Sequence, residues 1–219
     1  MPAKLEKFTF LSASKPGSTI NLKGLWPCLV PYGKSLRSIR IGNTFYTGRS
    51  RSYYYQSPLD FTSFQCLVSL SLSFSSIGPD FDQRRLLAPR LEMFEWTFDG
   101  PPLGRAGLAN FQQPEEDFLR RLARAAVARQ VPLGKIAIVF TPRAVLHLSR
   151  STRPSPTTLE YPWDCMGRLA DELRPLGIEL VYNTPSVTRE QHAAAVRAHN
   201  ERVEAIKGNR VWNKDNQCQ

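Results

Sequence analysis

The sequence predicts an α/β repeat fold, in which short, mostly parallel strands form one curved sheet and helices and loops lie on its convex side. Three observations support this prediction. A short apolar pattern recurs along most of the chain, with the alternation that a half-buried strand requires. Small polar residues follow most copies of the pattern, and amphipathic helices separate the later copies. One strand with one helix or loop cannot bury its own apolar face, so such units must stack.

The clearest copy of the pattern runs from Leu67 to Ser75 and reads L-x-x-L-x-L, followed by a polar residue three positions on. The last apolar residues of the copies are Phe10, Ile41, Leu72, Trp96, Ile138 and Leu180. The polar residues three positions later, absent only after the first copy, are Thr44, Ser75, Asp99, Thr141 and Asn183. Such side chains can bond to backbone groups where the chain leaves a strand. In the last copy, Pro175 holds the first leucine position.

Helical periodicity predicts helices at residues 22–29, 114–130, 163–174 and 187–207. Pro27 and Pro31 are expected to stop the first of these helices. Thr188 and Gln191 have the spacing of a capping box at the start of the last helix, and Gly208 is expected to end it. We therefore expect a single domain over residues 1–208, with the last helix as its C-terminal cap and residues 209–219 as a polar tail.

Two units near the C-terminus share further features, which strengthens the prediction of a repeat. Asp117 lies four residues before Arg121, and Asp164 lies four residues before Arg168, so each helix can form an ion pair. Each helix is also followed by a Pro-Leu-Gly tripeptide, at residues 132–134 and 175–177. The alternative is an ordinary α/β domain whose buried strands look alike.

The pattern L-x-x-L-x-L with a polar residue three positions on resembles that of leucine-rich repeats. The uneven spacing of the copies, together with the stretches Tyr32–Ile41 and Leu86–Trp96, is similar to the irregular leucine-rich regions of fungal F-box proteins. The resemblance implies an irregular leucine-rich-repeat solenoid that recruits a protein target. In members of that family, a separate N-terminal F-box docks to a cullin-type ubiquitin ligase. No such helical module precedes Leu5, so we expect a fragment, a truncated product or a diverged relative.

In a leucine-rich strand, the residues between the apolar positions face the concave surface of the sheet. A mixed face of hydroxyl groups with Arg and Glu suits protein recognition better than phosphate binding. We therefore expect a surface that binds a protein target at Arg40, Ser69, Ser71, Ser73, Glu95, Thr97 and Glu179. The alternative is a solvated sheet face that binds nothing.

A formal charge of +10 and a pI of about 9.8 leave a second function open, that of a basic RNA- or DNA-binding accessory protein. The arginines are spread along the chain rather than gathered in one track. The segment Arg49–Tyr55 combines arginines with tyrosines, as single-stranded nucleic-acid binders do, but such a short run is also typical of a plain exposed loop.

Residue patterns of catalysis, cofactor binding and metal binding are missing from the sequence, so we expect a protein that is not an enzyme. Cys165 and His147 lie among apolar residues and are expected to be packed. His192 and His199 share a helix face without a third ligand, and the four cysteines form no C-x-x-C pair. Because the sequence has no membrane-spanning run and no signal peptide, a cytoplasmic or nuclear location is expected.

Overall fold

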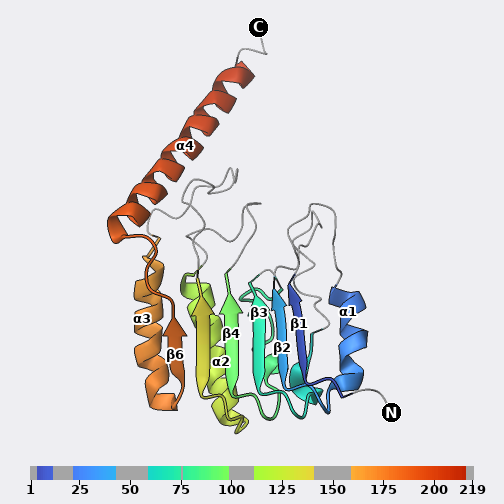
Figure 1. Ribbon diagram of the computed structural model, residues 1–219. Coiled ribbons are helices and arrows are strands. Elements are labelled where there is room, and N and C mark those ends of the chain that lie inside the picture. Colours follow the sequence, from blue (N-terminus) through green and yellow to red (C-terminus); the bar gives the residue numbers. More distant parts are fainter. Residues whose placement is uncertain are drawn as a thin grey trace.

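The structure, a computed structural model of the chain, describes residues 4–11, 22–42, 59–74, 76–98, 111–140 and 159–215. Its six strands form one sheet in which every neighbouring pair is parallel, and their order in the sheet is their order in the sequence (Figure 1). They are β1 (Lys7–Leu11), β2 (Ser38–Gly42), β3 (Ser69–Ser73), β4 (Met93–Thr97), β5 (Lys135–Val139) and β6 (Glu179–Tyr182). The predicted α/β class and parallel sheet are confirmed.

Helical segments alternate with the strands. The α-helices are α1 (Leu22–Leu29), α2 (Gln113–Ala128), α3 (Pro162–Leu173) and α4 (Arg189–Asp215). The 3-10 helices are η1 (Val30–Tyr32), η3 (Phe61–Ser63), η4 (Gln83–Leu86) and η6 (Arg174–Leu176). Helix α4 extends away from the sheet, whereas α1, α2 and α3 flank it (Figure 1). None of the described helices is long and apolar enough to cross a membrane.

The register of the first five strands is the one that the repeated pattern predicts. The residues Phe10, Ile41, Leu72, Trp96 and Ile138 are successive partners across the sheet. The prediction is wrong for the last strand, because Ile138 pairs with Tyr182 and the predicted residue Leu180 pairs with Ile136. The rule of a polar residue three positions on misled the alignment, because it matched Asn183 with Thr141 and so placed Leu180, rather than Tyr182, beside Ile138.

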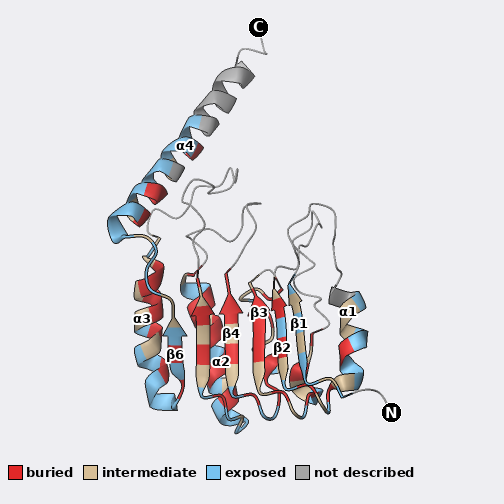
Figure 2. Cartoon of the chain, viewed as in Figure 1, coloured by how far each residue is buried: buried red, intermediate tan, exposed pale blue. Residues whose placement is uncertain are grey.

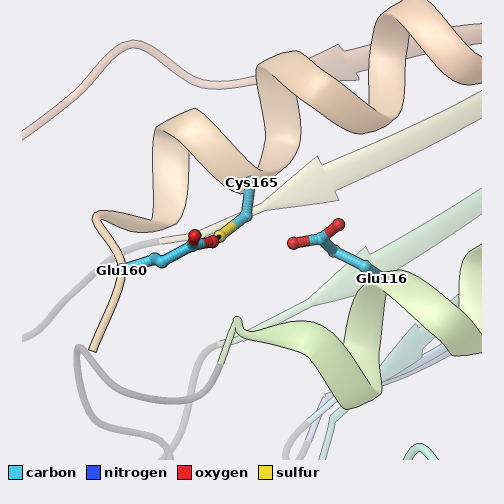
Figure 3. A group of neighbouring side chains, drawn as sticks. All are labelled: Glu116, Glu160 and Cys165. Carbon is cyan, nitrogen blue, oxygen red and sulfur yellow. Dashed lines mark hydrogen bonds between the residues drawn. The ribbon is translucent and has the colours of Figure 1, made fainter. Parts of the chain in front are cut away.

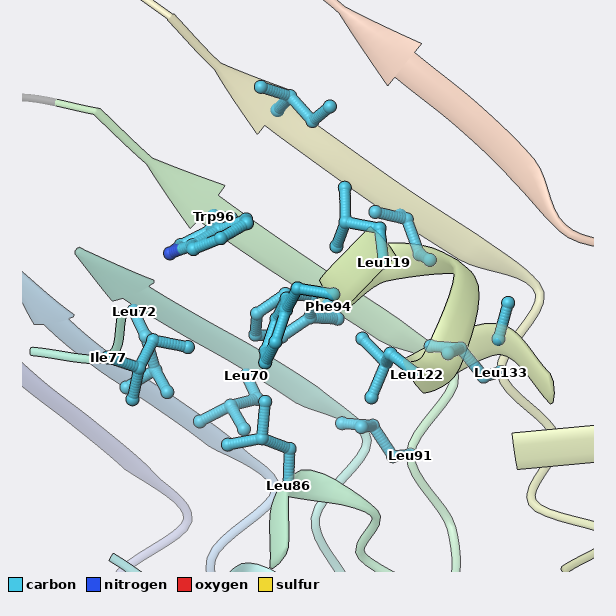
Figure 4. Close-up of a cluster of buried hydrophobic side chains, with 14 of the residues drawn as sticks. Leu70, Leu72, Ile77, Leu86, Leu91, Phe94, Trp96, Leu119, Leu122 and Leu133 are labelled. Carbon is cyan, nitrogen blue, oxygen red and sulfur yellow. The ribbon is translucent and has the colours of Figure 1, made fainter. Parts of the chain in front are cut away.

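The core lies on one side of the sheet, and buried residues dominate its central strands β3 and β4 (Figure 2). Its centre joins Leu70, Phe94 and Leu122 with other large apolar side chains (Figure 4). Phe118 of α2 lies 4.8 Å from Trp96 of β4, measured between ring centroids, so this helix packs on the buried face of the sheet. Packing of aromatic rings therefore continues from the strands into the helical layer.

The sheet is open and not curled, whereas the sequence predicted a curved one (Figure 1). Curvature in a repeat protein arises from a small rotation that each unit repeats. Here the outer elements differ from unit to unit, since η4 stands between β3 and β4 where α2 stands between β4 and β5. Because these outer elements differ in size, they do not impose the same rotation between each pair of neighbouring strands, and the sheet does not curl.

The predicted helices at 114–130 and 163–174 are confirmed as α2 and α3, within two residues at each end. The capping box is also confirmed: the Thr188 N–H donates to Gln191 Oε1, and the Gln191 N–H donates to Thr188 Oγ1. Gly208 does not end α4, which continues to Asp215, so the predicted tail begins as helix. A glycine inside a helix costs only about 1 kcal/mol relative to alanine, which neighbouring helix formers can offset. Pro27 likewise lies inside α1 rather than after it.

Candidate functional site

The face of the sheet opposite the core carries the predicted binding residues, and we call it the open face. Its side chains form rows because the strands share one register. The central row consists of Thr9, Arg40, Ser71, Glu95, Ala137 and Val181. The row nearer the amino ends of the strands consists of Lys7, Ser38, Ser69, Met93, Lys135 and Glu179.

Three predicted residues from neighbouring strands interact at the centre of the open face. The Ser71 hydroxyl donates to Glu95 Oε1 at 2.6 Å, and Arg40 Nη2 lies 3.8 Å from the same oxygen. Arg40 keeps 49% of its side chain exposed, against 18% for Glu95. The carboxylate is therefore held in place by its neighbours, while the guanidinium remains accessible with donors to spare. We call these three residues the polar cluster.

Two other predicted residues lie on this face but are not exposed. Ser73 is 1% exposed and Thr97 is 4% exposed, so these two predicted binding residues are buried. Ser71 is also buried, at 7%, beneath the longer side chains of its neighbours Arg40 and Glu95. Small residues on a central strand lose solvent contact when larger side chains flank them. Ser69 remains partly exposed and stays available for contact.

The position predicted for Glu179 within the face is wrong. The shifted register of β6 places Glu179 beside Lys135, with 3.7 Å between its carboxylate and the ammonium group. Val181 takes the place in the central row that Glu179 was expected to hold. The period-two alternation of Leu180 and Tyr182, both of which face the core side, could have revealed this register.

The polar residue after β6 has the structural role that the sequence predicts. The Phe140 N–H donates to Asn183 Oδ1 at 2.8 Å, and Asn183 Nδ2 donates to the Phe140 carbonyl at 2.7 Å. This side chain thus bonds both backbone groups of the residue just after β5. The other polar residues predicted for this role lie outside the described residues: Thr44, Ser75, Asp99 and Thr141. The Arg49–Tyr55 segment and His147 also lie outside them.

The group with the most metal-like composition among the described residues is Glu116, Glu160 and Cys165, whose ligand atoms lie within 4.8 Å of one another (Figure 3). Two guanidinium groups already neutralise it, since Arg120 and Arg168 each lie 2.6 Å from the Glu116 carboxylate. A divalent cation would have to displace these cations. The cluster is therefore a network of ion pairs that joins α2 to α3.

The ion pairs that a spacing of four allows do not form: Asp117 pairs with a different arginine of its own helix, and Asp164 pairs with an arginine of another helix. Asp117 pairs with Arg120 at 2.8 Å rather than with Arg121, which donates to the Pro79 carbonyl. Asp164 pairs with Arg189 at the start of α4. Sequence spacing identifies neighbours on one helix, but it cannot identify neighbours on the next helix.

Cys165 and His192 are both buried. The Cys165 thiol is buried and donates to Glu160 Oε2 at 3.1 Å, and both burial and the acidic neighbours raise its pKa. A thiol that stays protonated is a poor nucleophile. Burial lowers the pKa of His192, whose ring packs edge-on against Tyr161. The predicted burial of Cys165 is confirmed.

Comparisons of the chain with protein-family models, with curated proteins and with solved structures gave no match. The functional argument therefore rests on the geometry of the open face and on the sequence pattern.

Proposed function

We propose that this chain is a non-catalytic protein-binding domain that receives its target on the open face of the sheet. The observation that carries the proposal is the polar cluster of Arg40, Ser71 and Glu95, which spans three adjacent strands. Charged groups held by their neighbours lose little conformational freedom when a partner binds. Such groups also select partners through complementary charge.

The composition of the surrounding surface supports a protein rather than a nucleic acid as the target. Cations and anions lie side by side on the open face, as with Lys135 beside Glu179 and Arg40 beside Glu95. A phosphate backbone would be repelled by the carboxylates, whereas a protein surface offers both signs of charge. Several other arginines are already paired with carboxylates: Arg84, Arg120, Arg168 and Arg189.

The finer assignment to leucine-rich repeats is part of the same proposal. It is supported by the L-x-x-L-x-L pattern and by a parallel sheet whose strand order follows the sequence. A role as the target-recognition part of a ubiquitin-ligase adaptor rests only on the resemblance to F-box proteins. Capture of the ligase's linker protein by a chain that includes the coding sequence upstream of Met1 would support that role, and failure of capture would remove it.

A charge swap in the polar cluster tests the binding face. The double variant Arg40→Glu/Glu95→Arg retains an intramolecular ion pair, so we expect an unchanged circular dichroism spectrum and thermal unfolding. Partners that quantitative affinity capture identifies with the wild-type chain should bind the variant at least tenfold more weakly, because the charge pattern is inverted.

Swapping Arg174 and Asp171, an exposed pair at the end of α3, provides the matched control and should leave capture unchanged. Equal capture by wild type and the Arg40/Glu95 swap would refute the proposal. A salt titration distinguishes protein binding from the alternative function, RNA or DNA binding. Nucleic-acid binding would weaken steeply as the salt concentration rises and would vanish after nuclease treatment.

A further inference from the structure

The two outer strands of the sheet present complementary edges. In every described strand pair, the N–H of the first residue of the later strand donates to the carbonyl of the residue just before its register partner on the earlier strand. The N–H of Ser38 donates to the Glu6 carbonyl at 3.1 Å, and the N–H of Glu179 donates to the Gly134 carbonyl at 2.9 Å. The constant pattern means that the outer edge of β6 presents the same arrangement of groups that β1 to β5 each present to the next strand.

Backbone groups at both outer edges point away from the sheet. Because the Glu179 N–H is directed toward β5, the N–H and carbonyl of the next residue, Leu180, point to the opposite side. By the same alternation, the N–H groups of Lys7 and Thr9 point away from β2. Among the described residues, β1 pairs only with β2, and β6 pairs only with β5. Such edges are templates for a further strand.

The apolar core is also less well covered at its two ends. Phe8 and Phe10 of β1 are only partly buried, whereas their partners Ile39 and Ile41 are fully buried. At the other end, a hollow of about 400 Å³ lies beside β6. Its lining residues are Ala170, Arg174, Gly177, Ile178, Glu179 and Leu180. An aromatic side chain beside Leu180 would bury apolar surface in this hollow.

If the register of the sheet continued from β6 of one copy into β1 of a second copy, residues with complementary properties would lie beside each other. Lys7 of the second copy, an exposed residue, would lie beside Glu179, whose side chain is 66% exposed, and the two charges are opposite. Phe8 would lie beside Leu180, on the side of the sheet where the hollow opens. The sequence of β1 thus has the alternation of a basic and an apolar residue that the edge of β6 would select.

We propose that β1 of one copy pairs in parallel with β6 of a second copy, so that the two sheets become continuous. This contact is heterologous, because different surfaces of the two copies meet. Each added copy leaves one free edge at each end, so association forms chains of copies rather than a closed dimer. The inference uses the sheet edges alone and does not depend on the proposed target-binding role of the open face.

Sedimentation velocity over a concentration series tests the proposal with the full chain. The average mass of the wild type should rise with concentration. Thr9→Pro removes an outward N–H from an edge strand, where proline is tolerated, and should abolish association. Thr9→Val keeps the N–H and the β-branched shape, so it serves as the matched control and should associate like the wild type.

Charge reversal gives a second test that does not depend on how well the proline variant folds. Lys7→Glu and Glu179→Lys should each weaken association roughly three- to tenfold, and the double variant should recover most of the loss. A wild-type chain that stays monomeric over the whole series would overturn the proposal. Association of Thr9→Pro equal to that of Thr9→Val, with the proline variant folded, would overturn it as well.

Discussion

Glu115 and Glu116 are consecutive carboxylates in the first turn of α2, and both are buried in different surroundings. Glu116 has two guanidinium partners, whereas Glu115 accepts one bond from the Gln112 N–H at 3.0 Å. Burial is the main cause that raises the pKa of Glu115 from 4.5 to about 7, and the nearby charges of Asp80 and Glu116 add to it. The backbone N–H groups of Gln112 and Glu115 lower the pKa but do not replace the water that the carboxylate loses on folding.

The raised pKa of Glu115 makes stability depend on pH. Between pH 4.5 and 7 the folded chain retains a proton that the unfolded chain has released, so the free energy of unfolding falls as pH rises through this window. Glu115→Gln keeps the acceptor for Gln112 but cannot ionise. We expect the variant to be more stable than the wild type at pH 8, by up to about 3 kcal/mol, with little difference at pH 4.

Urea unfolding at several pH values measures this effect, and Glu201→Gln on the exposed side of α4 controls for the loss of one surface charge. Equal pH dependence of Glu115→Gln and the wild type would show that Glu115 ionises as readily in the folded chain as in the unfolded one.

Between elements, α2 and α3 are joined by ion pairs as well as by apolar packing. Glu116 of α2 contacts Arg168 of α3 at 2.6 Å, and Glu172 of α3 contacts Arg120 of α2 at 2.5 Å. The Glu116 side chain is 0% exposed, so its charge is stabilised by Arg120 and Arg168 rather than by water. The network therefore fixes the two helices relative to each other.

Removing the central carboxylate should weaken this helix pair. Glu116→Gln leaves Arg120 with Asp117 and Glu172, and Arg168 with Glu160, so the cost should be about 2–4 kcal/mol in the free energy of unfolding. Arg174→Gln breaks an exposed pair with Asp171 and should cost less than about 0.5 kcal/mol. Chemical denaturation compares the two variants, and equal losses would mean that burial adds nothing to the Glu116 interactions.

The strands and helices could be predicted from the sequence where a single local pattern of residues determines them. The alternation of apolar residues gave the register of β1 to β5, and Thr188 with Gln191 gave the start of α4. The register of strand β6 was misplaced because the match of Asn183 with Thr141 outweighed the alternation of Leu180 and Tyr182. The ion pairs between helices and the hollow depend on which elements become neighbours in space, and no local pattern contains that information.

At the scale of the whole molecule, the sheet has a well-covered centre and two open edges. Leu70, Leu72, Phe94 and Trp96 of β3 and β4 are fully buried, and each of these strands has a partner on both sides. The outer strands β1 and β6 each pair with one described neighbour and lie where the core is less well covered. Local opening should therefore begin at the edges and reach the centre last.

Native-state hydrogen exchange measures this order directly. In dilute protein, the amides of β3 and β4 should exchange only with global unfolding, whereas those of β1 and β6 should exchange through smaller openings at lower free energy. Raising the protein concentration should slow exchange in β1 and β6 and leave β3 and β4 unchanged, because pairing between copies would protect only the outer edges. Thr9→Pro should remove that dependence on concentration and Thr9→Val should keep it. Equal exchange of all six strands in dilute protein would contradict the expected order of opening.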